Sequence, residues 1–325
     1  MNHSIGKKLT AFVTAREFIL AALLVLASVV ISFFSPVFLS MTNILAIITA
    51  ITVNGIIAVG MVMLLASGEM DLSVGMTMAF TGVVAAKLMV AGVPVLPAIV
   101  VALLVAGLIG FINGFFVSYV GLNAFITTLG MSCCIEGLML VLANGRSVTG
   151  VPDSFKILGQ GKLLGVQYPI FVLLALVIVA DILFRNARRL RQIYYVGSNA
   201  KAAKLNGINV QRIKLLVFMF TGLTAGLTGI LFAARLGSAS VTIGGSTALD
   251  VITACIIGGA SLNGGKGSVL GAVLGALFLS VLSTALNLLS VNIYWQNFAT
   301  GAILILAILL DALSERRKSA GKKLL

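Results

Sequence analysis

The 325-residue chain has few charged residues, few prolines and few cysteines. Asp, Glu, Lys and Arg make up only 10% of it, whereas 60% is hydrophobic and the mean hydropathy is +1.16. This composition supplies too little polar surface to cover a water-soluble globule of this length, so a soluble fold is excluded. Several apolar stretches of about 20 residues, without the alternation of barrel strands, instead predict an all-α polytopic membrane bundle.

The three cysteines, Cys133, Cys134 and Cys255, all lie inside apolar stretches. None has a partner at metal-ligand spacing, so no metal site is expected. We predict that they are small core residues.

The chain lacks the GxxxxGK[ST] loop with which many ATPases hold phosphates. The glycine-rich stretch Gly258 to Gly271 does not have that spacing, and its Lys266 is followed by Gly267. We predict a tight cytoplasmic turn here, with Gly271, Gly275 and Ala276 allowing close approach of the following helix. The missing loop fits an expectation that the family resemblance described below implies, namely that this chain alone has no enzymatic activity and binds no cofactor.

Pro, Gly and charge clusters divide the chain into ten candidate membrane helices. The first apolar run has span length and no small-residue cleavage site, so it is expected to remain as an anchor. The eighth is short, and residues 248–260 are compatible with either a full span or a re-entrant segment. The predicted helices are 17–34, 43–66, 72–91, 95–119, 124–143, 168–184, 212–234, 248–260, 268–289 and 294–312.

Positive charge is concentrated on one side of this predicted topology. With the N-terminus inside, cytoplasmic segments hold 17 of the 22 Lys and Arg residues, eight of them in Arg185 to Lys214. The opposite side keeps Arg146, Lys156, Lys162 and Arg235. We therefore expect both termini in the cytoplasm. The net charge of +13 then reflects topology and anionic headgroups, and no nucleic-acid partner is expected.

The segment Arg185 to Lys214 contains no Asp or Glu. Gly197-Ser198-Asn199 is suited to capping a short helix from Ala200 to Leu205, which Asn206-Gly207 would end. The alanines favour close docking in a protein groove, whereas the charges also fit a basic loop lying on the membrane. Residue chemistry alone leaves both readings open.

On the other side, Asn144 to Gln167 predicts a surface loop with one short helix, too small to bind a ligand by itself.

Two further groups of polar residues interrupt the apolar sequence. In Ser67 to Gly75, Asp71 or Ser73 could cap the third helix, and a contact with an ATPase or a gating role is the alternative for Asp71.

Polar side chains inside spans are costly and so are functional candidates, with interhelical hydrogen bonding as the alternative. Their amides and hydroxyls suit a neutral polyol such as a sugar. They are Asn54, Asn113, Asn123, Thr127, Thr128, Glu136, Asn287 and Asn297.

Four stretches resemble the permease subunits of the ribose-type family of bacterial ABC importers. They are YYVGSNAKAAKLNGINVQRIK in the basic segment, SGEMDLSVG (Ser67 to Gly75), LNAFITTLGM (Leu122 to Met131) with ANGRSV after it, and GGASLNGGKGSVLGAVLGALFL (Gly258 to Leu279). Glu69 and Glu136 depart from the residues common in that family. For Glu136, a position at the outer mouth or a pair with Arg146 or Arg235 is considered.

The resemblance implies a single transmembrane permease domain, residues 1–325, in the bacterial inner membrane, with 185–214 as its cytoplasmic coupling segment. It implies a cytoplasmic ABC ATPase that carries the ATP and magnesium, a periplasmic sugar-binding protein and a second permease subunit, identical or different. Alternating access would import a monosaccharide. Other readings are a nucleoside, a branched-chain amino acid or a furanosyl signalling molecule as solute, an ion-coupled secondary transporter, and a passive pore or scaffold.

Three sets of site residues follow from these arguments. The ATPase-coupling set is Tyr195, Gly197, Asn199, Ala200, Ala202, Ala203, Leu205, Gly207 and Arg212. The substrate-pathway set is Asn54, Asn113, Asn123, Thr127, Thr128 and Asn287. The structural or gating set is Asp71, Ser73, Gly75, Gly264, Gly265 and Gly267.

Overall fold

The computed structural model describes residues 16–322. Three of the basic residues counted as cytoplasmic above therefore lie outside the described residues: Lys7, Lys8 and Lys323. The chain is an all-α bundle, as predicted, with a single two-stranded hairpin within the described range. Its helices before the hairpin are α2 (Arg16–Phe34), α3 (Met41–Ala66), α4 (Val74–Val90), α5 (Val95–Phe115), the π-helix η1 (Phe116–Val120), α6 (Ala124–Ala143) and α7 (Asp153–Gln160). The remaining elements are β1 (Lys162–Leu163), β2 (Val166–Gln167), α8 (Tyr168–Asn186), α9 (Arg188–Ser198), α10 (Ala200–Leu205), α11 (Val210–Leu236), α12 (Thr247–Ile257), α13 (Val269–Leu288) and α14 (Ile293–Lys322).

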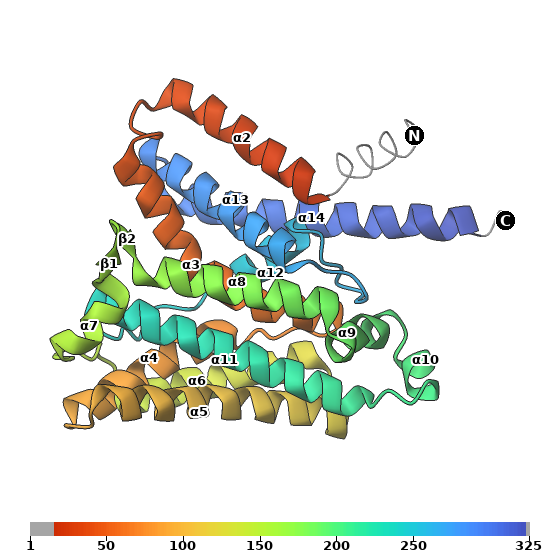
Figure 1. Cartoon of the computed structure of the whole chain (residues 1–325), viewed down its shortest axis with the longest axis horizontal. Helices are drawn as coiled ribbons and strands as arrows, with labels where there is room; N and C mark the ends of the chain where they lie inside the picture. The colour runs from red at the N-terminus through yellow and green to blue at the C-terminus, as the bar shows by residue number, and fades with distance from the viewer. Residues whose placement is uncertain (1–15, 323–325) are drawn as a thin grey trace.

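Helix α11 is the centre of one half of the bundle, where it packs against α3, α4 and α5 (Figure 1). Small residues permit this close packing. A methyl group on Gly229 of α11 would lie 2.0 Å from the Met78 carbonyl oxygen of α4. On the other side of α3 lie α12 and α13, and α13 also contacts α2.

The predicted small-residue packing of α13 is confirmed. A methyl group on Gly271 would lie 2.2 Å from the Gly258 carbonyl oxygen, and one on Gly275 would lie 2.0 Å from that of Ala254. Ala276 is fully buried. Helices α12 and α13 therefore meet backbone to backbone.

Ten apolar helices coincide with the ten predicted segments in the described part of the chain, but only seven are long enough to span a membrane alone. Helix α8 reaches that criterion only together with α9, from which it is bent by 77°, while α4 and α12 are shorter. The 11 residues of α12 extend about 16 Å, roughly half of a hydrocarbon core. This length favours the re-entrant reading over a full span for residues 248–260.

The segment Asn144 to Gln167 contains α7, which confirms the short helix expected there, and the β1–β2 hairpin. Phe155 of α7 is fully buried, and a methyl group on Gly159 would lie 2.1 Å from the Arg235 nitrogen at the end of α11. Lys156 donates to the Asp153 carboxylate at 2.8 Å and thereby holds the pKa of that carboxyl below its ordinary value. This segment lies at the opposite end of the bundle from α9 and α10 (Figure 1).

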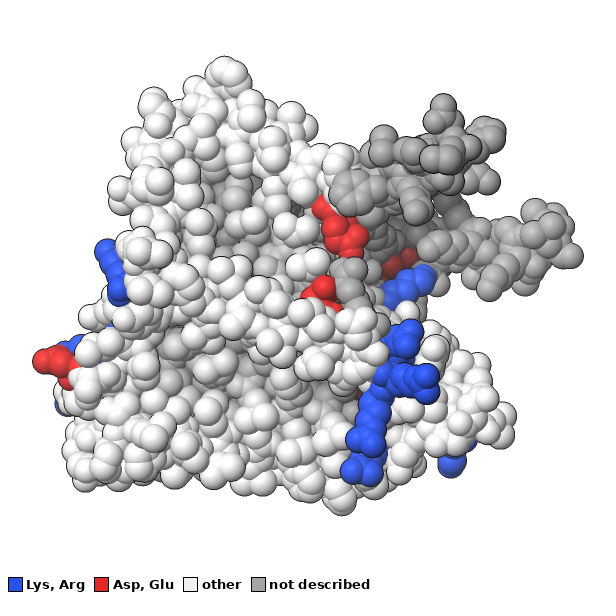
Figure 2. All heavy atoms as spheres, viewed as in Figure 1, with Lys and Arg blue, Asp and Glu red and all other residues white. Residues whose placement is uncertain are grey.

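Charge is distributed unevenly between the two ends. Lys and Arg gather at the end that carries α9 and the start of α11, with few at the other end (Figure 2). The first residues of α2 and the last of α14 also lie at the α9 end (Figure 1). This placement agrees with an even number of membrane crossings.

Candidate functional site

Helix α10 has the predicted bounds, Ala200–Leu205, and both predicted ends. Asn199 Oδ1 accepts a hydrogen bond from the Ala202 N–H at 3.0 Å, which caps the first turn. Gly207 follows the helix with φ +76°, a left-handed conformation that glycine adopts without strain. Ala203 packs inward, whereas Leu205 is 89% exposed.

Around α10, most of the remaining coupling set is accessible. Ala200 and Ala202 are exposed, as is the Arg212 side chain at the start of α11. Tyr195 on α9 is 57% exposed. Small exposed residues beside one large apolar side chain form a surface that a protein partner could cover closely.

The chain just before α10 is fixed to two other segments at glycines. A methyl group on Gly197 would lie 1.9 Å from the Ala66 carbonyl oxygen at the end of α3, and one on Gly264 would lie 2.7 Å from the Gly197 carbonyl oxygen. The Gly265 N–H donates to the Ala66 carbonyl at 2.9 Å, and the Tyr194 hydroxyl donates to the Gly267 carbonyl at 2.8 Å. The coupling segment, the end of α3 and the α12–α13 loop therefore form one three-way junction, the glycine junction.

A buried polar cluster lies in the connection between α3 and α4. Asp71 Oδ1 accepts hydrogen bonds from the Ser73 N–H at 2.7 Å and from the Ser73 hydroxyl at 2.6 Å. Asn113 of α5 donates from Nδ2 to Asp71 Oδ2 at 3.2 Å and to Ser73 Oγ at 2.9 Å. The Leu72 N–H donates to Thr128 Oγ1 of α6 at 3.0 Å. This polar cluster joins the connection to both α5 and α6.

The capping prediction for α4 is only half right. Asp71 accepts the N–H of Ser73, two residues later, as in an Asx-turn. Ser73 occupies the N-cap position but makes no side-chain capping bond, because its hydroxyl faces Asp71 and Asn113. This turn delays the start of α4 to Val74 instead of residue 72.

The polar cluster and the glycine junction are connected by the short segment from the end of α3 to Asp71. Within it, Glu69 forms an ion pair with Lys214 in the first turns of α11. Both side chains are largely shielded, with relative exposures of 15% and 19%. Sequence reasoning missed this pair because the two residues are 145 positions apart; the only signal was that Glu69 departs from the family pattern.

The six predicted pathway residues do not converge on one site. Asn113 and Thr128 lie in the polar cluster, where Asn113 Oδ1 is buried without a hydrogen-bond partner in the described structure. Asn123 caps α6 and accepts the Thr127 hydroxyl at its carbonyl. Asn287 accepts a hydrogen bond from Gln296, whose role sequence reasoning did not identify. Asn54 is half-buried on α3, and Asn297 is exposed on α14.

Gly75 is also a close-contact position. A methyl group on it would lie 2.0 Å from the Gly244 carbonyl oxygen in the α11–α12 loop. The start of α4 therefore touches the chain that leads into the short helix α12. Gly264, Gly265 and Gly267 lie in the glycine junction.

Helix α6 differs from the other helices near the core because most of its surface is open. Glu136 is exposed on it, and within the described residues it forms no ion pair with Arg146 or Arg235. Cys133 and Cys134 are exposed, so the core prediction is wrong for them, whereas Cys255 on α12 is buried as predicted. Nothing lies within 4 Å of a methyl group built on Gly130 or Gly137.

Known proteins resemble this chain over most of its length. The ribose import permease protein RbsC of Haemophilus influenzae is 39% identical over 314 residues, 95% of each chain. RbsC of Escherichia coli is 40% identical over 296 residues, 90% of this chain and 92% of its own. The L-arabinose ABC transporter permease protein AraH of Azospirillum brasilense is 37% identical over 289 residues, 88% of this chain and 85% of its own. No solved structure matches.

These relatives confirm the resemblance noted from the four sequence stretches. A family model described as "Branched-chain amino acid transport system / permease component" matches residues 43–308, well over half of the chain. The chain therefore belongs to this family of transport-system permease components.

Proposed function

We propose that the chain is the membrane permease subunit of a binding-protein-dependent ABC importer in the bacterial inner membrane, and that it moves a monosaccharide into the cytoplasm. The observation that carries the proposal is that the exposed helix α10 directly follows the glycine junction, which is one short segment away from the polar cluster. The names of the similar ribose and L-arabinose permeases support a monosaccharide as the solute. The family description keeps a branched-chain amino acid as the second candidate.

A cytoplasmic ABC ATPase is the partner that we assign to α10. Ala200, Ala202 and Leu205 would contact a groove on it, and that ATPase would carry the ATP and magnesium. Lys201 and Lys204 are exposed on the same helix, so the groove is expected to carry acidic residues at its rim.

The contacts described above suggest how a conformational change of the ATPase is transmitted to the membrane helices. Movement of α10 displaces Gly197, which touches the end of α3. The following connection is tied to α11 through Glu69 and Lys214, and to α6 through Leu72 and Thr128. If the two ATPase states differ in their contacts with α10, each state shifts the equilibrium between two arrangements of α6 and α11.

A second permease subunit is proposed against α6. An ionised carboxylate such as that of Glu136 is costly against lipid, and such residues normally face a protein interior or water. The open glycines Gly130 and Gly137 allow another helix to approach closely. We infer that α6 faces the second subunit and a water-filled pathway between the two.

On the opposite end, α7 and the β1–β2 hairpin are proposed to receive a periplasmic sugar-binding protein. Leu164 at the hairpin turn is 93% exposed, and Leu163 is 52% exposed. Exposed apolar residues on a compact surface element are typical of protein contact sites. Because this element is fixed to α11 at Gly159, docking there would act directly on the central helix.

Transport by the assembled complex in proteoliposomes tests this function. With the ATPase, the binding protein and radiolabelled ribose present, uptake should stop when ATP is omitted and persist when ionophores collapse the ion gradients. Uptake that follows the ion gradient and ignores ATP would instead establish a secondary transporter. Leucine in place of ribose tests the second candidate solute.

A further inference from the structure

A cavity of about 680 Å³ lies between α8, α9 and α11, and none of its described lining residues comes from α6. It is lined mainly by apolar side chains from α8 and α11. None of its described lining residues belongs to the polar cluster or the glycine junction. One lining residue, Arg212, also belongs to the ATPase-coupling set, but no site described above accounts for the cavity itself or for its apolar wall.

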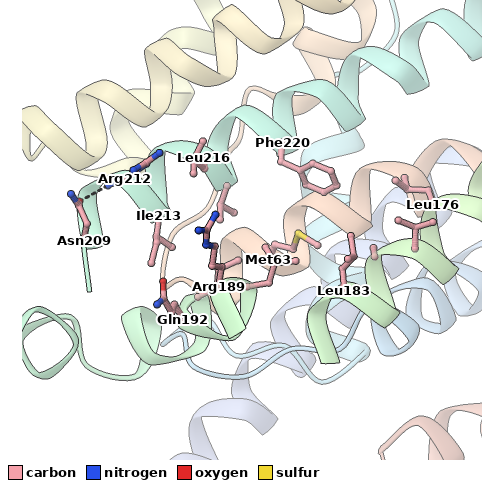
Figure 3. A pocket seen from close by; sticks show the side chains of 15 residues that line it. Met63, Leu176, Leu183, Arg189, Gln192, Asn209, Arg212, Ile213, Leu216 and Phe220 are labelled. Atoms are coloured by element: carbon pink, nitrogen blue, oxygen red, sulfur yellow. Dashed lines mark hydrogen bonds between the residues drawn. The ribbon is translucent and has the colours of Figure 1, made fainter. Parts of the chain in front are cut away.

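The two ends of the cavity differ in chemistry (Figure 3). Arg189 of α9 and Arg212 of α11 lie at one end with Gln192, whereas Leu176 and Phe220 lie toward the other. No Asp or Glu is among the described residues that line it. The cavity therefore offers two unneutralised guanidinium groups beside a long apolar wall.

The depth of the cavity matches one leaflet of a bilayer. Arg212 lies in the first turn of α11, and Phe220 follows eight residues later, a rise of about 12 Å along the helix. One leaflet of a hydrocarbon core is about 15 Å thick. Arg189 lies in the first turn of α9, which is bent by 77° from α8. We infer that this bend marks the membrane surface at the α9 end of the bundle. The charged end is thus at headgroup level and the apolar end at acyl-chain level.

We propose that this cavity binds one anionic phospholipid from the leaflet at the α9 end of the bundle. The lipid phosphate accepts hydrogen bonds from Arg189 and Arg212, since guanidinium groups pair with phosphate in a forked geometry. One acyl chain lies along Leu176, Leu183 and Phe220. Basic pockets between membrane helices suit anionic headgroups.

Other occupants fit the cavity less well. A sugar would leave the apolar wall without partners and find few polar groups there. A soluble ATPase surface would have to place apolar side chains at acyl-chain depth. Leu183 and Leu216 line the cavity and are 47% and 52% exposed, so the apolar wall is open along its side, as entry of a lipid chain requires.

Lipid retention by the purified full-length chain tests the proposal. The detergent-solubilised protein is titrated with dioleoyl phosphatidylglycerol or dioleoyl phosphatidylcholine, and bound lipid is counted by native mass spectrometry. We expect at least a tenfold preference for phosphatidylglycerol, reduced to less than twofold in the Arg189→Gln/Arg212→Gln protein. Arg188→Gln removes a charge from the neighbouring position, which does not line the cavity, and should keep the preference. An equal loss in Arg188→Gln, or an unchanged preference in the double variant, would overturn the proposal.

A second variant tests the apolar end without changing charge. Leu183→Trp should fill the acyl-chain portion and reduce phosphatidylglycerol retention at least fivefold while the protein elutes as a monodisperse peak. Wild-type retention by this variant would exclude the cavity as the lipid site. Glycerol phosphate serves as the free-headgroup probe: competition at micromolar concentration would assign the arginines to a soluble phosphate. Displacement of the lipid by the bound ATPase would assign the cavity to the protein interface, and both results would overturn the proposal.

Discussion

The side-chain amide of Asn113 donates a hydrogen bond to Asp71 Oδ2 at 3.2 Å, across 42 residues of sequence. Asp71 is only 2% exposed, and in the described part of the chain no Lys or Arg forms an ion pair with it. Its carboxylate is instead held by neutral donors from Ser73 and Asn113. This arrangement fixes the α3–α4 connection against α5 at the point where it also touches α6.

Replacing Asp71 with Ala should destabilise the protein, because the buried donors of Ser73 and Asn113 lose their acceptor. Each unsatisfied buried group costs about 1–3 kcal/mol. The thermal midpoint of the purified chain should fall, and uptake by the complex should fall with it. Asp153→Ala removes a surface carboxylate from α7 and should change the midpoint little. Equal midpoints for the two variants would contradict a structural role for the polar cluster.

Local signals in the sequence predicted α10 with the observed bounds, because Asn199 and Gly207 define its two ends. Most helix boundaries were also placed closely, since glycines, prolines and charges interrupt the apolar stretches, although α14 extends to Lys322, ten residues beyond its predicted end. Asp71 and Asn113 were nevertheless assigned to different roles, although they touch. A helix that is apolar on all sides does not reveal which face a polar residue occupies. The Glu69–Lys214 pair depends on tertiary packing alone.

The glycine junction predicts a strong effect of a single methyl group. In Gly197→Ala the new Cβ would lie 1.9 Å from the Ala66 carbonyl oxygen, which neither backbone can accommodate without shifting. Substrate-stimulated ATPase activity of the complex should fall at least tenfold. Gly245→Ala is the matched control, because nothing lies within 4 Å of the added methyl group. If the Gly197→Ala complex has the same substrate-stimulated ATPase activity as the Gly245→Ala complex, the glycine junction has no part in coupling.

The cysteines of α6 provide a direct test of the proposed subunit interface. Treatment of membranes with a short bismaleimide should yield a covalent dimer through Cys133 or Cys134, which are exposed. The dimer should disappear in the Cys133→Ala/Cys134→Ala protein and persist in Cys255→Ala, because Cys255 is buried. Denaturing gel electrophoresis measures the product. An assembled complex that gives no dimer would place α6 away from the second subunit.

The proposed orientation predicts opposite accessibility for two exposed leucines. Leu205 on α10 and Leu164 in the hairpin turn are 89% and 93% exposed. In a cysteine-free background, Leu205→Cys should react with a membrane-impermeant maleimide only in inverted vesicles, and Leu164→Cys only in spheroplasts. Labelling of Leu205→Cys from the periplasm would reverse the topology and with it the assignment of α10 to a cytoplasmic partner.

The most direct measurement of the central claim is substrate-stimulated ATPase activity together with uptake in the assembled complex carrying Ala202→Glu. Ala202 is exposed on α10, so a larger charged side chain should block docking in an ATPase groove without disturbing the bundle. Both activities should fall at least tenfold, whereas Ala202→Ser should retain them. Gly207→Pro, which alters the left-handed end of α10, should behave like Ala202→Glu. Wild-type stimulation and uptake in both variants would contradict the assignment of α10 as the coupling helix.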